Sequence, residues 1–363
     1  MSIGSCAGTA TGNNGMRTVR RRQLFLCGAA IGAALAVCVP GGSAAARQDP
    51  LPAILARQQN ISFEGERLRI VVRSDSLKTR ITNRQLVRHR PMSDYRVDYL
   101  DLPEGRESHF LAEGNRIYEW RDDERVYVSE RSDDQTLGLV ISPAYLGLLE
   151  ANYRITRRRG ETIAGRSTWD LRITGRNPGR PSIRAWIDTE HGVPLRFERY
   201  DEGGELYMQT EYQSIRFGVE LDEGVFQLPD QAELRSTSRG TQYDTPEALA
   251  DKTGLPTPLL QRSPEGFRLD RILHLVRRDR QYVQTFYSDG LATLSVFAER
   301  RPDEAPVGST ERVHTVRSGV RGGQAWAQGW IGPVRITLFS DDLPEAELVR
   351  SLSSTVLATW LPD

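Results

Sequence analysis

The chain has 363 residues, with 48 basic and 48 acidic side chains. Residues 1–46 hold all three cysteines, four arginines and no acidic residue, so the other 317 residues carry 44 basic and 48 acidic groups. This slight acidic excess argues against a nucleic-acid-binding protein, which normally carries a basic surplus. After residue 46 the lack of cysteine excludes disulfides and thiolate metal sites, and the lack of a long apolar run excludes an integral membrane protein.

Residues 1–46 have the composition of a secretory signal peptide. The basic cluster Arg20, Arg21 and Arg22 precedes an apolar stretch, and small residues follow at 43–46. We predict cleavage between Ala46 and Arg47, and therefore an exported protein.

The export route stays open between two alternatives. The arginine pair before Gln23-Leu24-Phe25 resembles a twin-arginine signal, but a basic cluster also opens leaders of the general route. An uncleaved anchor and lipidation of Cys38 are two weaker alternatives for the same segment.

Residues 61–228 predict one strand after another. Apolar and polar residues alternate along 67–72 and 183–188, which is the period of a half-buried strand. Helices are expected only at 51–58 and 142–152. We therefore expect a mainly β fold for 47–228, with a large antiparallel sheet that is curved or partly closed.

The rest of the chain predicts a linker and a smaller α/β domain. Residues 229–264 contain five prolines and polar filler, and within them Thr245-Pro246 is a helix-start signal. Residues 265–363 predict six strands, followed by a helix with an apolar stripe from Leu348 to Leu357. The expected divisions are 1–46 signal peptide, 47–228 half-barrel, 229–264 linker and 265–363 small domain.

The residues supply no catalytic constellation, so we predict a protein that is not an enzyme and has no cofactor or metal. The five histidines are scattered without metal-ligand spacing, and no nucleophile elbow or phosphate loop is present. One basic run stands out: Arg157, Arg158 and Arg159 form either a solvated strand end or a patch for acidic partners or lipid headgroups.

Aromatic residues are frequent on the predicted strands. In a flat sheet under a helix they would be core, whereas a large curved sheet encloses more volume than its side chains fill. Helices then cap an apolar cavity suited to acyl chains of lipids or lipoproteins. Counting by strand parity, we expect its lining to include Tyr95, Val97, Tyr99, Phe110, Tyr118, Trp120, Trp186 and Phe197.

Several short motifs follow one another in a fixed order. That order is Asn152-Tyr153, Ala164-Gly165-Arg166, Arg184-x-Trp186-x-Asp188, Gly192-x-Pro194-Leu195, Tyr287-Ser288-Asp289-Gly290-Leu291 and Ser295-Val296-Phe297. It resembles the RseB/MucB family of periplasmic regulators of sigma-E and the envelope stress response, over nearly all of the chain after the leader. The segment 336–344 departs from the family's usual ending.

The resemblance implies a first domain that is a large unclosed antiparallel β-barrel with capping helices, similar to the lipoprotein carrier LolA, and a small α/β second domain. It also implies a periplasmic protein, peripheral to the inner membrane, that binds the periplasmic segment of an RseA-like membrane anti-sigma factor and shields it from regulated proteolysis. Lipid or mislocalised lipoprotein in the first domain would release that partner. The expected partner-binding or small-domain motif is Tyr287, Ser288, Asp289, Gly290 and Leu291. We expect Tyr287 and Phe297 to lie in the small domain's core.

Two other functions remain as alternatives. A LolA-like lipoprotein or lipid carrier would need only the first domain, which leaves the second unexplained. A hydrolase of envelope material would need a catalytic group, and the sequence offers none.

Overall fold

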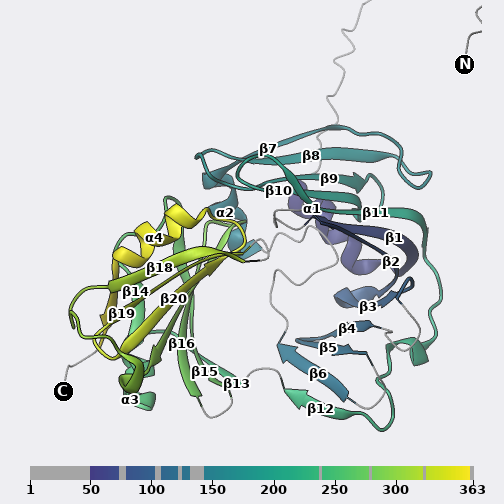
Figure 1. The fold of residues 1–363 in the computed structure, drawn as a ribbon. Coiled ribbons are helices and arrows are strands. Elements are labelled where there is room, and N and C mark those ends of the chain that lie inside the picture. Colours follow the sequence, from purple (N-terminus) through teal and green to yellow (C-terminus); the bar gives the residue numbers. More distant parts are fainter. Residues whose placement is uncertain are drawn as a thin grey trace, which may run out of the picture. The chain divides into compact units, whose positions relative to one another are not determined.

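The computed structural model describes residues 50–72, 79–102, 108–121, 125–130, 143–236, 239–277, 280–321 and 324–359. All of them belong to one compact unit, Asp49–Asp363, which is mainly β and contains two large sheets (Figure 1). The predicted signal peptide and the cleavage site at Ala46 and Arg47 lie outside the described residues. None of the described helices combines the length and apolarity needed to span a membrane.

The larger sheet has twelve strands. They are β1 (Phe63–Val72), β2 (Arg80–Arg90), β3 (Asp94–Tyr99), β4 (His109–Glu113), β5 (Arg116–Trp120), β6 (Arg125–Glu130), β7 (Tyr153–Arg159), β8 (Thr168–Gly175), β9 (Ser182–Asp188), β10 (Pro194–Tyr200), β11 (Leu206–Phe217) and β12 (Glu233–Ser236). Their order is β12-β6-β5-β4-β3-β2-β1-β11-β10-β9-β8-β7, and every pair is antiparallel except β12–β6. The outermost strands β12 and β7 do not pair with each other, so the predicted unclosed antiparallel sheet is confirmed.

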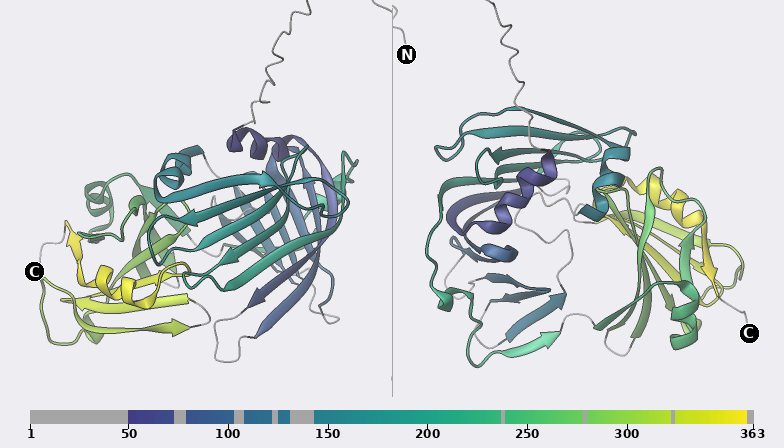
Figure 2. Two further views of the ribbon diagram at one scale, coloured as in Figure 1. Left: turned by 90° about the horizontal axis from the view of Figure 1, so that it is seen from above. Right: turned by 180° about the vertical axis from the view of Figure 1, so that it is seen from behind.

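Both helices expected beside this sheet are present. They are α1 (Leu51–Ala56), which continues as a 3₁₀ turn, and α2 (Pro143–Asn152). Figure 2 shows α1 lying across one face of the sheet, where Ile54 and Leu55 join a core with buried residues of β8 and β9. From α2, Leu149 enters the same core, so the helices bury the apolar side of the strands as the alternation pattern requires.

The smaller sheet has seven antiparallel strands. They are β13 (Arg239–Tyr243), β15 (Arg268–Arg277), β16 (Arg280–Ser288), β17 (Thr293–Arg300), β18 (His314–Arg321), β19 (Gln324–Ile331) and β20 (Val334–Ser340). Their order is β13-β15-β16-β17-β20-β19-β18, and α4 (Glu345–Ser353) packs against β19 and β20. A separate pair joins β14 (Thr257–Leu260) to β21 (Thr355–Ala358). The expected smaller α/β part is thereby confirmed.

The segment 229–264, predicted as a linker, contains secondary structure. It contributes β12 to the larger sheet, β13 to the smaller one, and the helix α3 (Pro246–Thr253). As the sequence predicted, Thr245 caps this helix, because its side-chain oxygen accepts a hydrogen bond of 3.1 Å from the Ala248 amide. Prolines fit here because Pro246 stands in the first helical turn. The domain limits at 228 and 265 stay predictions.

The apolar stripe from Leu348 to Leu357 does not belong to one helix. α4 ends at Ser353, where hydroxyl groups of Ser353 and Ser354 donate to the carbonyl oxygens of Val349 and Ser351. These bonds take over carbonyls that a continuing helix would use. Leu357 therefore reaches the small-sheet core from β21 instead of from the helix.

Gly65 in β1 is required by a close backbone approach. A Cβ atom there would lie 2.6 Å from the carbonyl oxygen of Ser214, beside an irregularity in the β1–β11 pairing. We expect Gly65→Ala to lower the free energy of unfolding by about 1–3 kcal/mol, measured by urea denaturation. The matched control is Gly147→Ala on the exposed side of α2, which meets no atom within 4 Å and should raise it by about 0.5–1 kcal/mol. Equal effects of the two changes would contradict this account.

Candidate functional site

The motif from Tyr287 to Leu291 forms the end of β16 and the turn that follows it. Tyr287 is buried in the small-sheet core, and its hydroxyl accepts a hydrogen bond of 2.9 Å from the Leu260 amide. The Asp289 carboxylate accepts hydrogen bonds from the amides of Leu291 and Ala292, at 3.1 and 2.8 Å. The Ser288 hydroxyl accepts from the Gly290 amide at 3.0 Å. Side chains of the motif therefore specify the turn itself.

The same turn contacts the larger sheet through Asp289. The Tyr153 hydroxyl at the start of β7 lies 3.0 and 2.9 Å from the two carboxylate oxygens, and Arg180 Nε lies 3.2 Å from one of them. The Asn152 amide donates to the carbonyl oxygens of Asp289 and Gly266, at 2.9 and 3.2 Å. Asp289 has no exposed surface. We call this set of contacts, together with the Arg199–Asp342 ion pair described below, the junction.

Gly290 lies close to the backbone of α2 in the junction. Its φ of +102° is a conformation that other residues rarely adopt, and a Cβ atom would lie 2.6 Å from the Leu149 amide nitrogen in α2. Glycine is therefore needed here both for the turn and for the contact with α2.

A second ion pair links the two sheets. Arg199 Nη2 of β10 lies 2.6 Å from Asp342 Oδ1, which follows β20. The other carboxylate oxygen of Asp342 accepts a hydrogen bond of 3.1 Å from the Thr293 amide. Burial raises the pKa values of Asp342 and Asp289 above the ordinary range, with the arginines acting in the opposite direction. The junction is thus made of buried charges that are compensated only while the two sheets touch.

The predicted cavity residues are divided between the two faces of the larger sheet. Strand pairing sets Val97 opposite Phe110, so these two lie on one face with Tyr95 and Tyr99. Phe197 packs in the neighbouring core that includes α1. All five are buried or half-buried and apolar, and an acyl-chain site among them is a proposal.

Of the other three predicted cavity residues, Tyr118 and Trp120 point away from that face, whereas Trp186 is buried in the same core as Val97. Phe110 pairs with Glu119 across the β4–β5 turn, which puts Tyr118 and Trp120 on the opposite face. Trp186 alternates with Ala185, and the guanidinium carbons of Arg184 and Arg196 lie 4.1 and 4.7 Å from its ring centre. Counting aromatic residues by strand could not reveal this because the hairpin register decides the face.

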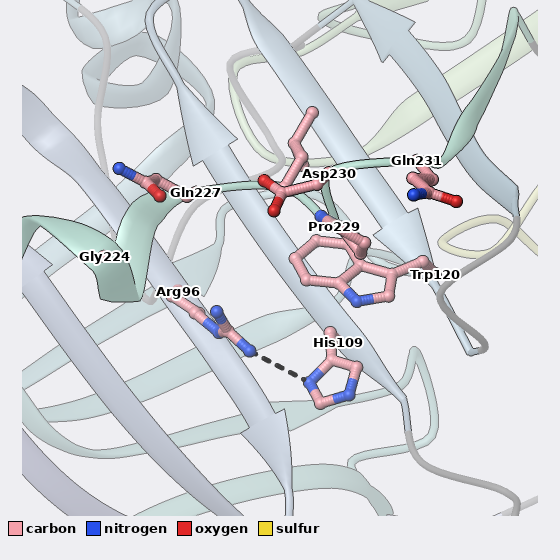
Figure 3. Close-up of a pocket in the computed structure, with 9 residues that line it drawn as sticks. Arg96, His109, Trp120, Gly224, Gln227, Pro229, Asp230 and Gln231 are labelled. Atoms are coloured by element: carbon pink, nitrogen blue, oxygen red, sulfur yellow. Dashed lines mark hydrogen bonds between the residues drawn. The ribbon is translucent and has the colours of Figure 1, made fainter.

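A pocket of about 790 Å³ lies on the opposite face, at the Trp120 side. Figure 3 shows Arg96 and His109 of neighbouring strands turned toward each other below the chain segment that carries Gly224 and Gln231. Arg96 Nη1 donates to the carbonyl oxygen of Val225 at 2.7 Å, which ties that segment to the sheet. In the sequence, this pocket was signalled only by the polar residues that alternate with apolar ones along the strands.

Arg96 and His109, which line this pocket, belong to a charged network centred on Asp98. Its carboxylate lies 2.8 Å from Arg96 Nε, 2.7 Å from Arg88 Nη1 and 2.6 Å from His109 Nδ1. Burial tends to raise the pKa of Asp98, but the hydrogen bonds from His109 and Arg96 outweigh it and lower the pKa below its ordinary value. This lining does not suit an acyl chain. No described group of three or more metal-ligating side chains is placed to hold a metal ion.

Comparisons with known proteins agree with the fold and the motifs. Residues 73–231 match the family model described as the MucB/RseB N-terminal domain. Residues 73–231 are therefore similar to a MucB/RseB N-terminal domain, which bears out the resemblance that the sequence motifs predicted. A search of the curated proteins found no match.

Solved structures with the same fold include MucB bound to MucA. The Pseudomonas aeruginosa MucA/MucB complex matches at 18% identity, covering 85% of this chain and 99% of that chain, with a TM-score of 0.59. A structure of MucB with MucA(peri) matches at 19% identity, covering 85% and 98%, also with a TM-score of 0.59. At these identities the likeness establishes a shared fold.

The Tyr153 hydroxyl is expected to stabilise the junction. Burial and the charge of Asp289 raise the pKa of Tyr153, so the hydroxyl stays protonated and donates a hydrogen bond to the carboxylate. Tyr153→Phe should lower the free energy of unfolding by about 1–3 kcal/mol, measured by urea denaturation, because the buried carboxylate loses a donor. Tyr127→Phe, at an exposed tyrosine of β6, is the control and should change it by less than about 0.5 kcal/mol. Similar small effects of both substitutions would contradict a structural role for the hydroxyl.

The lowered pKa of Asp98 makes its contribution to stability depend on pH. An unfolded aspartate titrates near its ordinary value of 3.8. The stabilisation is therefore complete above that pH and is lost as the pH falls through the lower pKa of the folded chain. Asp98→Asn should cost about 1–3 kcal/mol at pH 7, and the difference from the unsubstituted chain should shrink below pH 3.8 in urea denaturation. Asp251→Asn at an exposed site of α3 is the control at pH 7. A difference that grows on acidification would contradict the prediction.

Proposed function

We propose that this chain is an exported regulator that binds the periplasmic segment of a membrane anti-sigma factor and protects it from regulated proteolysis. The observation that carries the proposal is the fold shared with MucB of the MucA/MucB complex, over 85% of this chain and 99% of that one. That match extends too far to be confined to either sheet, so both sheets belong to the shared fold. The sequence motifs that resemble the RseB/MucB family support the same proposal.

The junction supplies a physical route for regulation. A ligand shifts a conformational equilibrium only by its difference in affinity for the two states. The partner binds the arrangement in which Asp289 and Asp342 are paired across the junction. Lipid or mislocalised lipoprotein, bound at the apolar face that carries Val97 and Phe110, favours another arrangement and releases the partner. No bond chemistry is needed for this function.

The first experiment is an affinity purification with tagged residues 47–363 from detergent-solubilised envelopes of the source organism. Bound proteins are identified by mass spectrometry, before and after addition of a synthetic diacylated lipopeptide. We expect a single-pass anti-sigma factor that is recovered without the lipopeptide and lost with it. Recovery of lipoproteins without any anti-sigma factor would contradict the regulator and favour the LolA-like carrier.

Two variants test where the lipopeptide acts in this experiment. Phe110→Gln places an amide on the apolar face and should raise the lipopeptide concentration needed for release by about tenfold, since burying an unpaired polar group costs roughly 1–3 kcal/mol. Tyr118→Gln is the matched control, because Tyr118 lies on the opposite face of the same hairpin. Thermal unfolding of both variants separates lost binding from lost folding. An equal shift in both would contradict a site on the face of Phe110.

A further inference from the structure

The strand β7 is an outer edge of the larger sheet. It is the last strand in the sheet order, and no other described strand pairs with its outer side. All seven of its residues, from Tyr153 to Arg159, pair with β8 without a bulge. A long, regular edge of this kind is a template on which another extended chain can add.

The backbone register identifies the groups that face outward. The Arg176 amide donates to the Asn152 carbonyl oxygen, and the Gly160 amide donates to the Thr168 carbonyl oxygen, both at 2.9 Å. In an antiparallel pair, hydrogen-bonded residues alternate with residues whose backbone groups point the other way. Even-numbered residues of β7 therefore bond to β8, and odd-numbered ones, including Ile155, direct their N–H and C=O groups outward.

The other described edges are less suited to adding a strand. In the larger sheet, β12 has only four residues. In the smaller sheet, β18 is interrupted by a register shift, with Thr315 at a φ of +53°, and β13 has five residues including Gly240. Short strands and bulges are common ways in which proteins blunt an edge. β7 has neither.

The side chains of β7 make this edge strongly basic. Together β7 and β8 contain five arginines and one acidic residue, Asp170. That carboxylate is buried and already lies 2.8 Å from Arg158, 3.0 Å from Arg184 and 3.6 Å from Arg172. Arg154 on this face and Arg159 on the other are exposed, and no described acidic group is paired with either of them. The Arg159 guanidinium carbon lies 5.0 Å from the ring centre of Trp169. Positive charge therefore remains on both faces of the strand.

We propose that β7 is a docking edge for an extended, acidic segment of a partner polypeptide, which adds to the larger sheet as a further strand. Outward backbone groups provide the hydrogen bonds, and the arginines on the two faces pair with alternating carboxylates of the added strand. A membrane surface offers the charge but cannot complete the backbone ladder. This inference rests on the proposed function and names where its partner binds.

Docking at β7 would act directly on the junction. Tyr153 is the first residue of β7, and its hydroxyl is bonded to Asp289 of the smaller sheet. A strand added along β7 restrains its backbone from Tyr153 onward. It therefore stabilises the arrangement in which Tyr153 reaches Asp289, and loss of the junction weakens docking by the same factor.

The test measures binding of residues 47–363 to a fluorescein-labelled peptide of alternating Glu, Thr and Val, by fluorescence anisotropy. We expect binding that weakens when the salt concentration rises, and none to a peptide with Lys in place of Glu. The double variant Arg154→Glu, Arg159→Glu should bind at least tenfold more weakly. The matched control, Arg277→Glu with Arg321→Glu on exposed positions of the smaller sheet, makes the same charge change and should bind within threefold of the unsubstituted chain. Equal losses in both pairs would overturn the proposal.

A second pair of variants tests the backbone ladder. Ile155→Pro removes an outward N–H while the bonds to β8 remain, because proline is tolerated on an outer edge. We expect it to abolish peptide binding, whereas Ile155→Ala, which keeps the N–H, should bind within threefold of the unsubstituted chain. Undiminished binding by a folded Ile155→Pro variant would overturn the proposal. The proposal would also be overturned if the unsubstituted chain bound phosphatidylglycerol vesicles but not the peptide, and the Arg154→Glu, Arg159→Glu variant no longer bound the vesicles.

The affinity purification separates this inference from the proposed function. If the unsubstituted chain captures an anti-sigma factor and Ile155→Pro captures it equally well, the docking edge is wrong and the proposed function stands. If the unsubstituted chain captures none, the proposed function fails, and the peptide titrations still decide whether β7 accepts an acidic strand.

Discussion

The burial of Asp289 is the constraint on which the arrangement of this molecule depends. A carboxylate without solvent contact is costly unless charge and hydrogen bonds compensate it. Two of its partners, the Leu291 and Ala292 amides, belong to its own turn, and two others, Tyr153 and Arg180, lie beyond it. The small sheet therefore cannot leave its place without exposing or stranding this charge. The compensation of this one buried carboxylate therefore depends on contact between the two sheets.

This kind of contact differs from an apolar interface. A hydrophobic contact loses free energy in proportion to the area that separates. When a buried ion pair separates, the attraction between its charges is lost but both charges become hydrated again. The net free energy cost of separation is therefore smaller than the attraction alone. With Arg180–Asp289 and Arg199–Asp342 at the junction, separation of the sheets returns four charged groups to water. Such an interface suits a protein that must change its packing when a ligand binds.

The sequence predicted the local structure well and the long-range contacts poorly. Alternation identified β1 and β9, and Thr245-Pro246 identified the start of α3, because both signals are carried by neighbouring residues. Tyr287 lies in the small-sheet core as expected, but Phe297 does not. It is half-buried on the other face, 5.9 Å from the ring of Phe339. The Tyr153–Asp289 contact joins residues 136 positions apart, and nothing local to either residue signals it.

The position of β7 connects local chemistry to the behaviour of the whole molecule. Arginines on an exposed edge are also a common protection against self-association, and that role alone would require only charge. It would not require a bulge-free strand of seven residues, nor that the strand begin at the tyrosine that holds Asp289. These features gain a purpose together if a partner strand adds there, since ordering the β7 backbone and closing the junction then stabilise each other. A regulator built in this way needs no separate relay between its binding edge and its moving contact, because Tyr153 belongs to both.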